Sequence, residues 1–217
     1  MATYDTAVAA ELLSGMRLAR QAIGRGELVV IPTDTVYGVA ADAFSPAAVT
    51  RLLEAKGRDR TAPPPVLIPG IPTLDALAEV VPDEVRALVA EFWPGGLTII
   101  MRARRTLDWD LGETRGTVAL RMPSHPIALE LLSETGPLAV SSANSTGQPP
   151  ATTAAKAEEM LGDAVAVYLE AGEGGTVPST IVDAIGLESE AGKLRIVRSG
   201  AVADADIRRV VGAERCA

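Results

Sequence analysis

The stretch 29–43, VVIPTDTVYGVAADA, shapes the interpretation of the whole chain, because an apolar strand runs directly into a turn of small hydroxyl side chains. The apolar and largely β-branched segment 27–31 predicts a buried strand. Thr33, Asp34 and Thr35 follow it almost at once. On local grounds this segment is either a polar turn or one wall of a ligand site. Motifs elsewhere in the chain are needed to decide between these two interpretations.

The composition describes an acidic chain with an aliphatic core. Of 217 residues, 47% are hydrophobic but only 3% are aromatic, so Val, Leu, Ile and Ala must fill the interior. This length favours one domain covering residues 1–217. A net charge of −8 argues against a surface that coats a polyanion, although it leaves room for a local basic cleft.

Several kinds of site are excluded by the residues present. Cys216 is the only cysteine and His125 the only histidine, which excludes an internal disulfide framework and a Cys- or His-based metal centre. His125 is expected to cap a helix or lie on the surface. No nucleotide-binding glycine motif and no nucleophile motif is present. The acids of segment 104–116 could bind a metal, but a solvated loop is the favoured interpretation.

No apolar run reaches the roughly 18–20 residues that a membrane span needs. The N-terminus, MATYDTAVAAELL, carries acids where a secretion signal requires bases. We therefore expect a cytoplasmic protein with no membrane association.

Helical and strand-like patterns are interspersed along the chain without strict alternation. Helices are predicted at 7–23, 46–55, 73–80, 83–92, 126–135, 153–161 and 204–211. Strands are predicted at 27–31, 66–68, 97–103, 117–122, 138–140, 165–170, 179–184 and 193–197. The fold class is α/β, a twisted mixed sheet flanked by helices. The polar connection 104–116 is predicted to be either a lid or a simple loop.

Four polar clusters directly follow these apolar elements. They are Thr33-Asp34-Thr35, Lys56-Gly57-Arg58-Asp59-Arg60, Ser141-Ser142-Ala143-Asn144, and Arg198-Ser199-Gly200. Each has an ordinary structural explanation, as a turn or a solvated helix end. If the loops converge beyond the sheet, the same residues supply cations, hydroxyls and an amide. That set suits positioning of an anionic substrate and electrostatic stabilisation of phosphoryl transfer.

Seven motifs in this order resemble the YrdC-like family of threonylcarbamoyl-AMP synthases. They are PTDTVYGVAADA (32–43), KGR (56–58), FWPGGLTII (92–100), TVALRMPSHP (117–126), SSANSTGQPP (141–150), STIVD (179–183) and LRIVRSGAV (194–202). Together with the surrounding segments they cover about residues 10–202, nearly the whole chain. The combination of PTDTVYG, KGR and SSAN is specific.

The resemblance implies a YrdC-like fold with a large concave cleft. It also implies that L-threonine, bicarbonate and ATP, with Mg²⁺, form threonylcarbamoyl-AMP and pyrophosphate. This reaction is the first step toward the threonylcarbamoyl modification of adenosine 37 in tRNA (t6A37). A separate transferase complex is then expected to move the group to tRNA, so the chain itself needs little or no direct tRNA binding.

The resemblance also implies roles for particular residues, motif by motif. The expected catalytic residues are Lys56, Arg58, Ser142 and Asn144. The expected threonine-binding residues are Thr35, Arg121, Ser141 and Ser179. The expected ATP-binding residues are Lys56, Arg58, Thr117, Ser142, Asn144 and Arg198. No metal ligand is assigned.

The chain departs from the family pattern after KGR. Many relatives carry an Asn and a His in the next segment, whereas this chain has Ala62 and Leu67 at those positions. It also resembles the short form of the family, without the C-terminal extension that folds over the active site in longer members. Two other functions remain as alternatives: a related carbamoyl-adenylate activity, and an RNA-binding module without catalysis, which the scarcity of aromatic residues disfavours.

Overall fold

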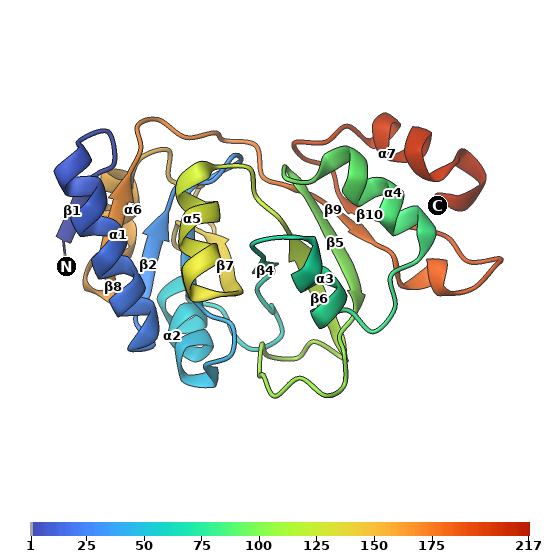
Figure 1. Ribbon diagram of the computed structural model, residues 1–217, viewed down its shortest axis with the longest axis horizontal. Helices are drawn as coiled ribbons and strands as arrows, with labels where there is room; N and C mark the ends of the chain where they lie inside the picture. The colour runs from blue at the N-terminus through green and yellow to red at the C-terminus, as the bar shows by residue number, and fades with distance from the viewer. Residues whose placement is uncertain (1) are drawn as a thin grey trace.

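The structure is a computed structural model that describes residues 2–217, and its strands form one ten-stranded mixed sheet (Figure 1). Residue 1 of the predicted 1–217 domain lies outside the described part. The strands are β1 (Ala2–Asp5), β2 (Leu28–Ile31), β3 (Gly38–Asp42), β4 (Val66–Leu67), β5 (Leu97–Arg102), β6 (Thr117–Arg121), β7 (Leu138–Ser142), β8 (Val165–Glu170), β9 (Thr180–Asp183) and β10 (Arg195–Arg198). Their order across the sheet is β1-β8-β2-β3-β7-β4-β6-β5-β9-β10. The mixed α/β fold class is confirmed.

The stretch 29–43 forms parts of two strands with a loop between them. β2 and β3 pair antiparallel, with Ile31 opposite Gly38, and segment 32–37 joins them. β3 also pairs antiparallel with β7, which brings Gly38 opposite Ser142. The threonine-rich loop and the SSAN turn therefore start at neighbouring strand ends.

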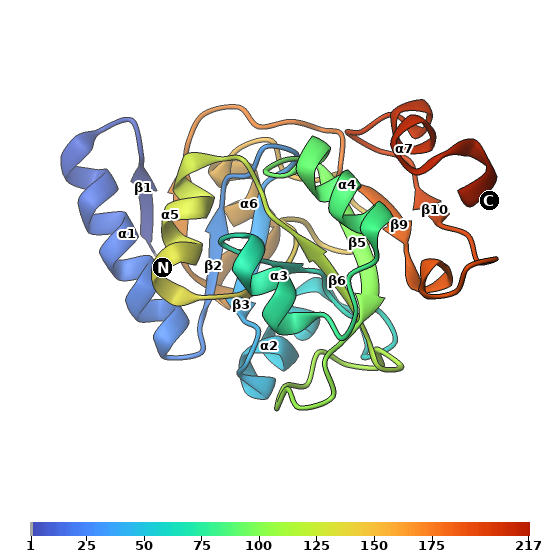
Figure 2. The same cartoon turned by 45° about the vertical axis from the view of Figure 1, so that its right-hand side comes forward.

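Seven α-helices cover the sheet over residues 2–217. They are α1 (Ala9–Gly24), α2 (Pro46–Lys56), α3 (Ile71–Leu77), α4 (Asp83–Phe92), α5 (Pro126–Thr135), α6 (Ala154–Leu161) and α7 (Asp204–Val211). Alternate residues of β2 point to opposite faces. Val29 and Ile31 pack with α1 and α5, whereas Leu28 and Val30 belong to the cluster that includes α2 and α6. In Figure 2, α1 and α5 lie on the same side of this half of the sheet.

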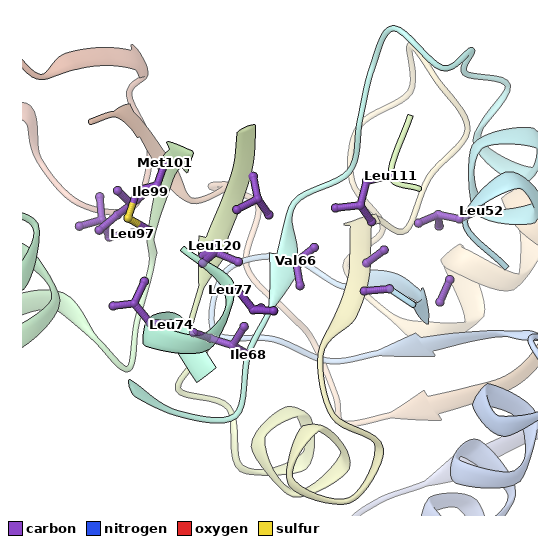
Figure 3. Close-up of a cluster of buried hydrophobic side chains, with 14 of the residues drawn as sticks. Leu52, Val66, Ile68, Leu74, Leu77, Leu97, Ile99, Met101, Leu111 and Leu120 are labelled. Carbon is purple, nitrogen blue, oxygen red and sulfur yellow. The ribbon is translucent and has the colours of Figure 1, made fainter. Parts of the chain in front are cut away.

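The other half of the sheet is buried mainly by α3 and α4. Leu74 and Leu77 of α3 lie close to Leu120 of β6 (Figure 3). Side chains of β5 belong to the same buried cluster. These side chains are fully or almost fully buried. Burial of a leucine contributes about 1.5–3 kcal/mol, so this aliphatic core replaces the aromatic residues that the composition lacks.

Several helices and strands of the structure have the bounds that the sequence predicts. The helices at 83–92, 126–135 and 204–211 and the strand at 165–170 are confirmed to the residue. Ser45 caps α2, because its hydroxyl accepts from the backbone N–H of Ala48 at 3.3 Å. Gly57 ends that helix in the left-handed region, with φ 63°. His125 caps α5 through Nδ1, which accepts from the N–H of Ile127.

The connection 104–116 is packed against the protein. Leu111 is 2% exposed and lies in the hydrophobic core. The ring of Trp109 stacks on Phe44 with centroids 5.5 Å apart, and Asp110 pairs with Arg60 at 2.6 Å. These contacts describe a docked loop beside the KGRDR segment.

Two kinds of feature are absent from residues 2–217. Within this range, no group of three or more His, Cys, Asp or Glu side chains is placed to hold a metal ion. No helix in the same range has the length and apolar character to cross a membrane.

Candidate active site

The polar clusters converge on one cavity of about 440 Å³. It is bounded by the threonine-rich loop after β2, the SSAN turn after β7 and the ends of β6, β9 and β10. Eight of the predicted site residues line it: Thr35, Arg58, Arg121, Ser141, Ser142, Asn144, Ser179 and Arg198. The remaining two, Lys56 and Thr117, do not line it.

The hydroxyl of Thr35 is held in a small threonine network. Thr33 donates its hydroxyl proton to the carbonyl of Val36 at 2.6 Å, and its oxygen accepts from the Thr35 N–H at 3.2 Å. The two threonine oxygens lie 3.2 Å apart. Since the Thr33 proton is already used, Thr35 can donate either to Thr33 or to a ligand. Gly175 presses on this loop so closely that a Cβ there would collide with the Thr35 carbonyl.

Arg121 is a buried guanidinium that keeps two donors free. Its Nε donates to the Gly95 carbonyl at 2.9 Å and its Nη1 to Thr35 Oγ1 at 2.8 Å. Its Nη2 donates to Asp34 Oδ1 at 2.8 Å. Three of the five guanidinium N–H groups are thus used within residues 2–217, which leaves one on each terminal nitrogen. Those two N–H groups and the Thr35 hydroxyl can bind one carboxylate.

Asp34 is what keeps the buried Arg121 in place. Its Oδ1 also accepts from the Ser124 N–H at 2.9 Å, which ties the loop after β2 to the segment after β6. Burial lowers the pKa of Arg121, and Asp34 opposes this effect by stabilising the cation. An arginine stays charged at any ordinary pH, so Arg121 remains a guanidinium cation paired with Asp34.

Two further arginines make the cavity cationic. Arg58 Nη1 donates to Ser141 Oγ at 3.3 Å. Arg198 donates through Nη2 to the Ser179 carbonyl at 2.7 Å. Burial, together with the proximity of Arg58, lowers the pKa of Arg198. Two cations this close attract an anionic ligand more strongly than either alone.

Lys56 lies behind the cavity wall, where its ammonium group holds the SSAN turn. The side chain is 1% exposed. Its Nζ donates to the Ser142 carbonyl at 2.5 Å, to Asn144 Oδ1 at 2.6 Å and to the Asn144 carbonyl. Burial and the nearby Arg58 lower the pKa of Lys56 to about 7. All three protons of the ammonium are used inside the protein.

Ser142 and Asn144 form the cavity side of the same network. The Ser142 hydroxyl donates to Asn144 Oδ1 at 2.6 Å. Because that proton is used, the Ser142 oxygen can face a ligand only as an acceptor in this arrangement. The sequence predicted Lys56 as a direct phosphate contact; that role stays a prediction, and the geometry favours a structural one.

Thr117, Leu67 and Ala62 differ in their position relative to the cavity. The Thr117 hydroxyl donates to the Thr114 carbonyl at 2.8 Å, outside the cavity. Thr117 and Arg121 stand at opposite ends of β6, about 13 Å apart at 3.3 Å per residue. Leu67 lines the cavity and gives it an apolar wall, whereas Ala62 does not line it.

The lining also contains polar residues to which the sequence assigned no role. Thr33 belongs to the first polar cluster, whereas Thr98 and Gln148 belong to none of the four. Thr98 stands inside the strand LTIIMR, where a single threonine gives no signal of a site. None of the lining residues is an Asp or Glu. Magnesium is usually held by one or two carboxylates together with phosphate oxygens, so these residues do not make a Mg²⁺ site of their own.

Known proteins of similar sequence share one name. A Mycobacterium tuberculosis protein that carries a provisional name as a threonylcarbamoyl-AMP synthase is 47% identical over 213 residues, which is 98% of this chain and 96% of that protein. The Pseudomonas aeruginosa threonylcarbamoyl-AMP synthase is 34% identical over 77% of this chain and 91% of its own length.

A solved structure and a family model extend the same finding. The crystal structure of Pyrococcus abyssi Sua5 complexed with L-threonine has a TM-score of 0.87 and 32% identity. That alignment covers 99% of this chain but only 62% of the archaeal chain, so the two proteins differ in extent. The family model for Sua5, YciO and YrdC, which carries the description "Telomere recombination", matches residues 21–200. The chain therefore belongs to the Sua5/YciO/YrdC family.

Proposed function

We propose that this protein joins L-threonine, bicarbonate and ATP into threonylcarbamoyl-AMP, with release of pyrophosphate, as the first step of t6A37 formation. The observation that carries the proposal is the composition of the cavity. Three arginines and several hydroxyls face one space of about 440 Å³, with no carboxylate among the lining residues. Such a cavity suits substrates that bring several negative charges together.

The amino acid is proposed to bind at Arg121. The two free N–H groups of this guanidinium form a fork for the α-carboxylate, and Thr35 donates its hydroxyl proton beside them. Ser141 and Ser179 complete the threonine pocket. Leu67 replaces the histidine of many relatives and supplies an apolar surface instead.

The reaction then needs two anions to meet. The neutral amine of threonine attacks the carbon of bicarbonate, and loss of water gives N-carboxythreonine. A carboxylate oxygen of that group attacks the α-phosphorus of ATP, the bond from the α-phosphorus to the bridging oxygen breaks, and pyrophosphate leaves. Arg58 and Arg198 lower the repulsion between these anions and stabilise the charge of the transition state. The reaction is therefore a nucleotidyl transfer.

The SSAN turn is proposed to stand at the reacting centre. Ser142 and Asn144 contact the nucleotide, Ser142 as an acceptor from one of its hydroxyl or amino groups, and Lys56 keeps the turn in position from behind. Thr117 is proposed to contact the far end of the nucleotide, about 13 Å along β6 from Arg121. Mg²⁺ enters as part of the MgATP substrate, bound to its phosphate oxygens.

The protein is proposed to act as one domain in the cytoplasm, where ATP and tRNA are found. A net charge of −8 gives the chain little attraction for tRNA outside the cavity. A separate transferase therefore has to accept the labile product.

The test is pyrophosphate release by the purified chain with ATP, Mg²⁺, bicarbonate and one amino acid at a time. The expected result is release that needs threonine and bicarbonate together. Equal release with carbamoyl phosphate and no threonine would indicate the carbamoyl-adenylate activity instead. Absence of turnover with tight, salt-sensitive RNA binding would indicate an RNA-binding module.

A further inference from the structure

Thr98 is a buried threonine whose hydroxyl has one partner. It lies in β5 and is 1% exposed. Its Oγ1 lies 2.8 Å from Ser179 Oγ, and no other hydrogen-bond partner of this hydroxyl exists among residues 2–217. A buried hydroxyl proton without an acceptor is costly. Either hydroxyl can be the donor in this contact, and donation from Thr98 is the direction that pairs its buried proton within residues 2–217, so Thr98 is taken as the donor.

The oxygen of Ser179 is consequently saturated as an acceptor. It receives the Thr98 proton, and it also receives an N–H of Arg198 Nη2 at 3.2 Å. A hydroxyl oxygen has two lone pairs and one proton. With both lone pairs used, only the Ser179 proton remains for a ligand in the cavity that this residue lines.

We infer that Thr98 is a positioning residue, which turns the hydroxyl of Ser179 so that it donates to an oxygen atom of the bound amino acid. Ser179 cannot accept from the ammonium group of that amino acid. The carboxylate of the amino acid already has a site at Arg121 and Thr35. The oxygen that accepts the Ser179 proton is therefore the side-chain hydroxyl of the amino acid. The pair thus makes the site selective for a hydroxy amino acid. This inference rests on the proposed function and adds the group that reads the substrate side chain.

The test compares two ligands that differ only in one hydroxyl, in four proteins. L-2-Aminobutyrate is L-threonine with its side-chain hydroxyl replaced by hydrogen. The proteins are the wild type, Thr98→Val, Ser179→Ala and the double variant, and valine keeps the shape of threonine without its hydroxyl. Calorimetric titration of the full chain measures the Kd of each ligand, so the result does not depend on turnover.

We expect Thr98→Val to weaken threonine binding about 3- to 10-fold, the effect of one net hydrogen bond, and to leave aminobutyrate binding unchanged. Added to Ser179→Ala, the valine substitution should change neither Kd further, because Thr98 acts only through Ser179. Thr98→Ser keeps the hydroxyl and should restore the wild-type preference.

Three results would overturn the inference. They are an unchanged preference in Thr98→Val, an equal loss for both ligands, and a further loss of threonine binding when Thr98→Val is added to Ser179→Ala. If the wild type shows the expected Kd pattern but releases no pyrophosphate with threonine and bicarbonate, the proposed reaction fails while the role of Thr98 stands.

Discussion

Replacing Lys56 with methionine would remove the buried ammonium from the SSAN turn while keeping most of the side-chain volume. Two of its three acceptors keep another donor: the Ser142 carbonyl still accepts from the Asn144 N–H at 3.0 Å, and Asn144 Oδ1 still accepts from Ser142 Oγ. The Asn144 carbonyl has no other donor among residues 2–217. One orphaned buried carbonyl costs about 1–3 kcal/mol, and this is the loss of unfolding free energy that we expect.

The effect on turnover should exceed the effect on stability. The turn carries Ser142 and Asn144, and a displacement of about 1 Å at a reacting centre can cost about 100-fold in rate. If Lys56 acts through the turn, kcat falls by this order while KM for ATP stays within about twofold of the wild type. If Lys56 binds the phosphates directly, KM for ATP rises instead.

The assay pairs urea unfolding at pH 6 with steady-state pyrophosphate release. Lys156→Met is the matched control, because this lysine is exposed and, among residues 2–217, its ammonium group has one hydrogen bond, to Thr152 Oγ1 at 2.9 Å. The control should stay within about 0.5 kcal/mol of the wild type and keep its turnover. A Lys56→Met variant with wild-type stability and wild-type kcat would refute the argument that the ammonium holds the turn.

Three other variants or conditions test the site. Arg121→Lys should raise KM for threonine about 10- to 100-fold in the pyrophosphate assay, because an ammonium cannot replace the guanidinium fork that Asp34 holds. Arg58→Ala should lower kcat about 100-fold with little change in thermal stability, since among residues 2–217 its guanidinium has one side-chain hydrogen bond, to Ser141 Oγ at 3.3 Å. Because the folded pKa of Lys56 is about 7, the unfolded chain holds one more proton between about pH 7 and 10. The free energy of unfolding should therefore rise with pH over this window in the wild type relative to Lys56→Met, as urea titrations at pH 7, 8 and 9 would measure.

The elements that the sequence predicts well are those whose signals are local. α4 and α5 have helical apolar spacing and clear ends, and both were predicted to the residue. β3 was missed because GVAAD has little strand propensity, and it becomes a strand by pairing with β2 and β7 on its two sides. β1 was missed for a related reason: its partner β8 follows about 160 residues later. Pairing of this kind is a property of the whole fold.

The residues of the candidate site also divide into those with a local sequence signal and those that depend on the whole fold. Thr35 and Asn144 stand in specific motifs shortly after strands, and Arg121 stands in such a motif at the end of β6, so their place in the cavity could be expected. Thr98 could not be found this way, because its significance depends on Ser179, 81 residues later, and on the direction of one shared proton. Lys56 stands in a motif too, but only the packing reveals that it points at the turn and away from the cavity.

The distribution of charge explains how an acidic protein can hold anionic substrates. Many arginines of the surface are paired with acids, as Arg20 is with Glu134 and Arg86 with Asp75. In contrast, Arg58 and Arg198 contact only hydroxyl and carbonyl oxygens among the described residues, so their charge is not cancelled. Uncompensated cations in a partly buried cavity attract anions far more strongly than paired ones on the surface. The net charge of −8 therefore describes the outside of the molecule, while the substrate meets a positive interior.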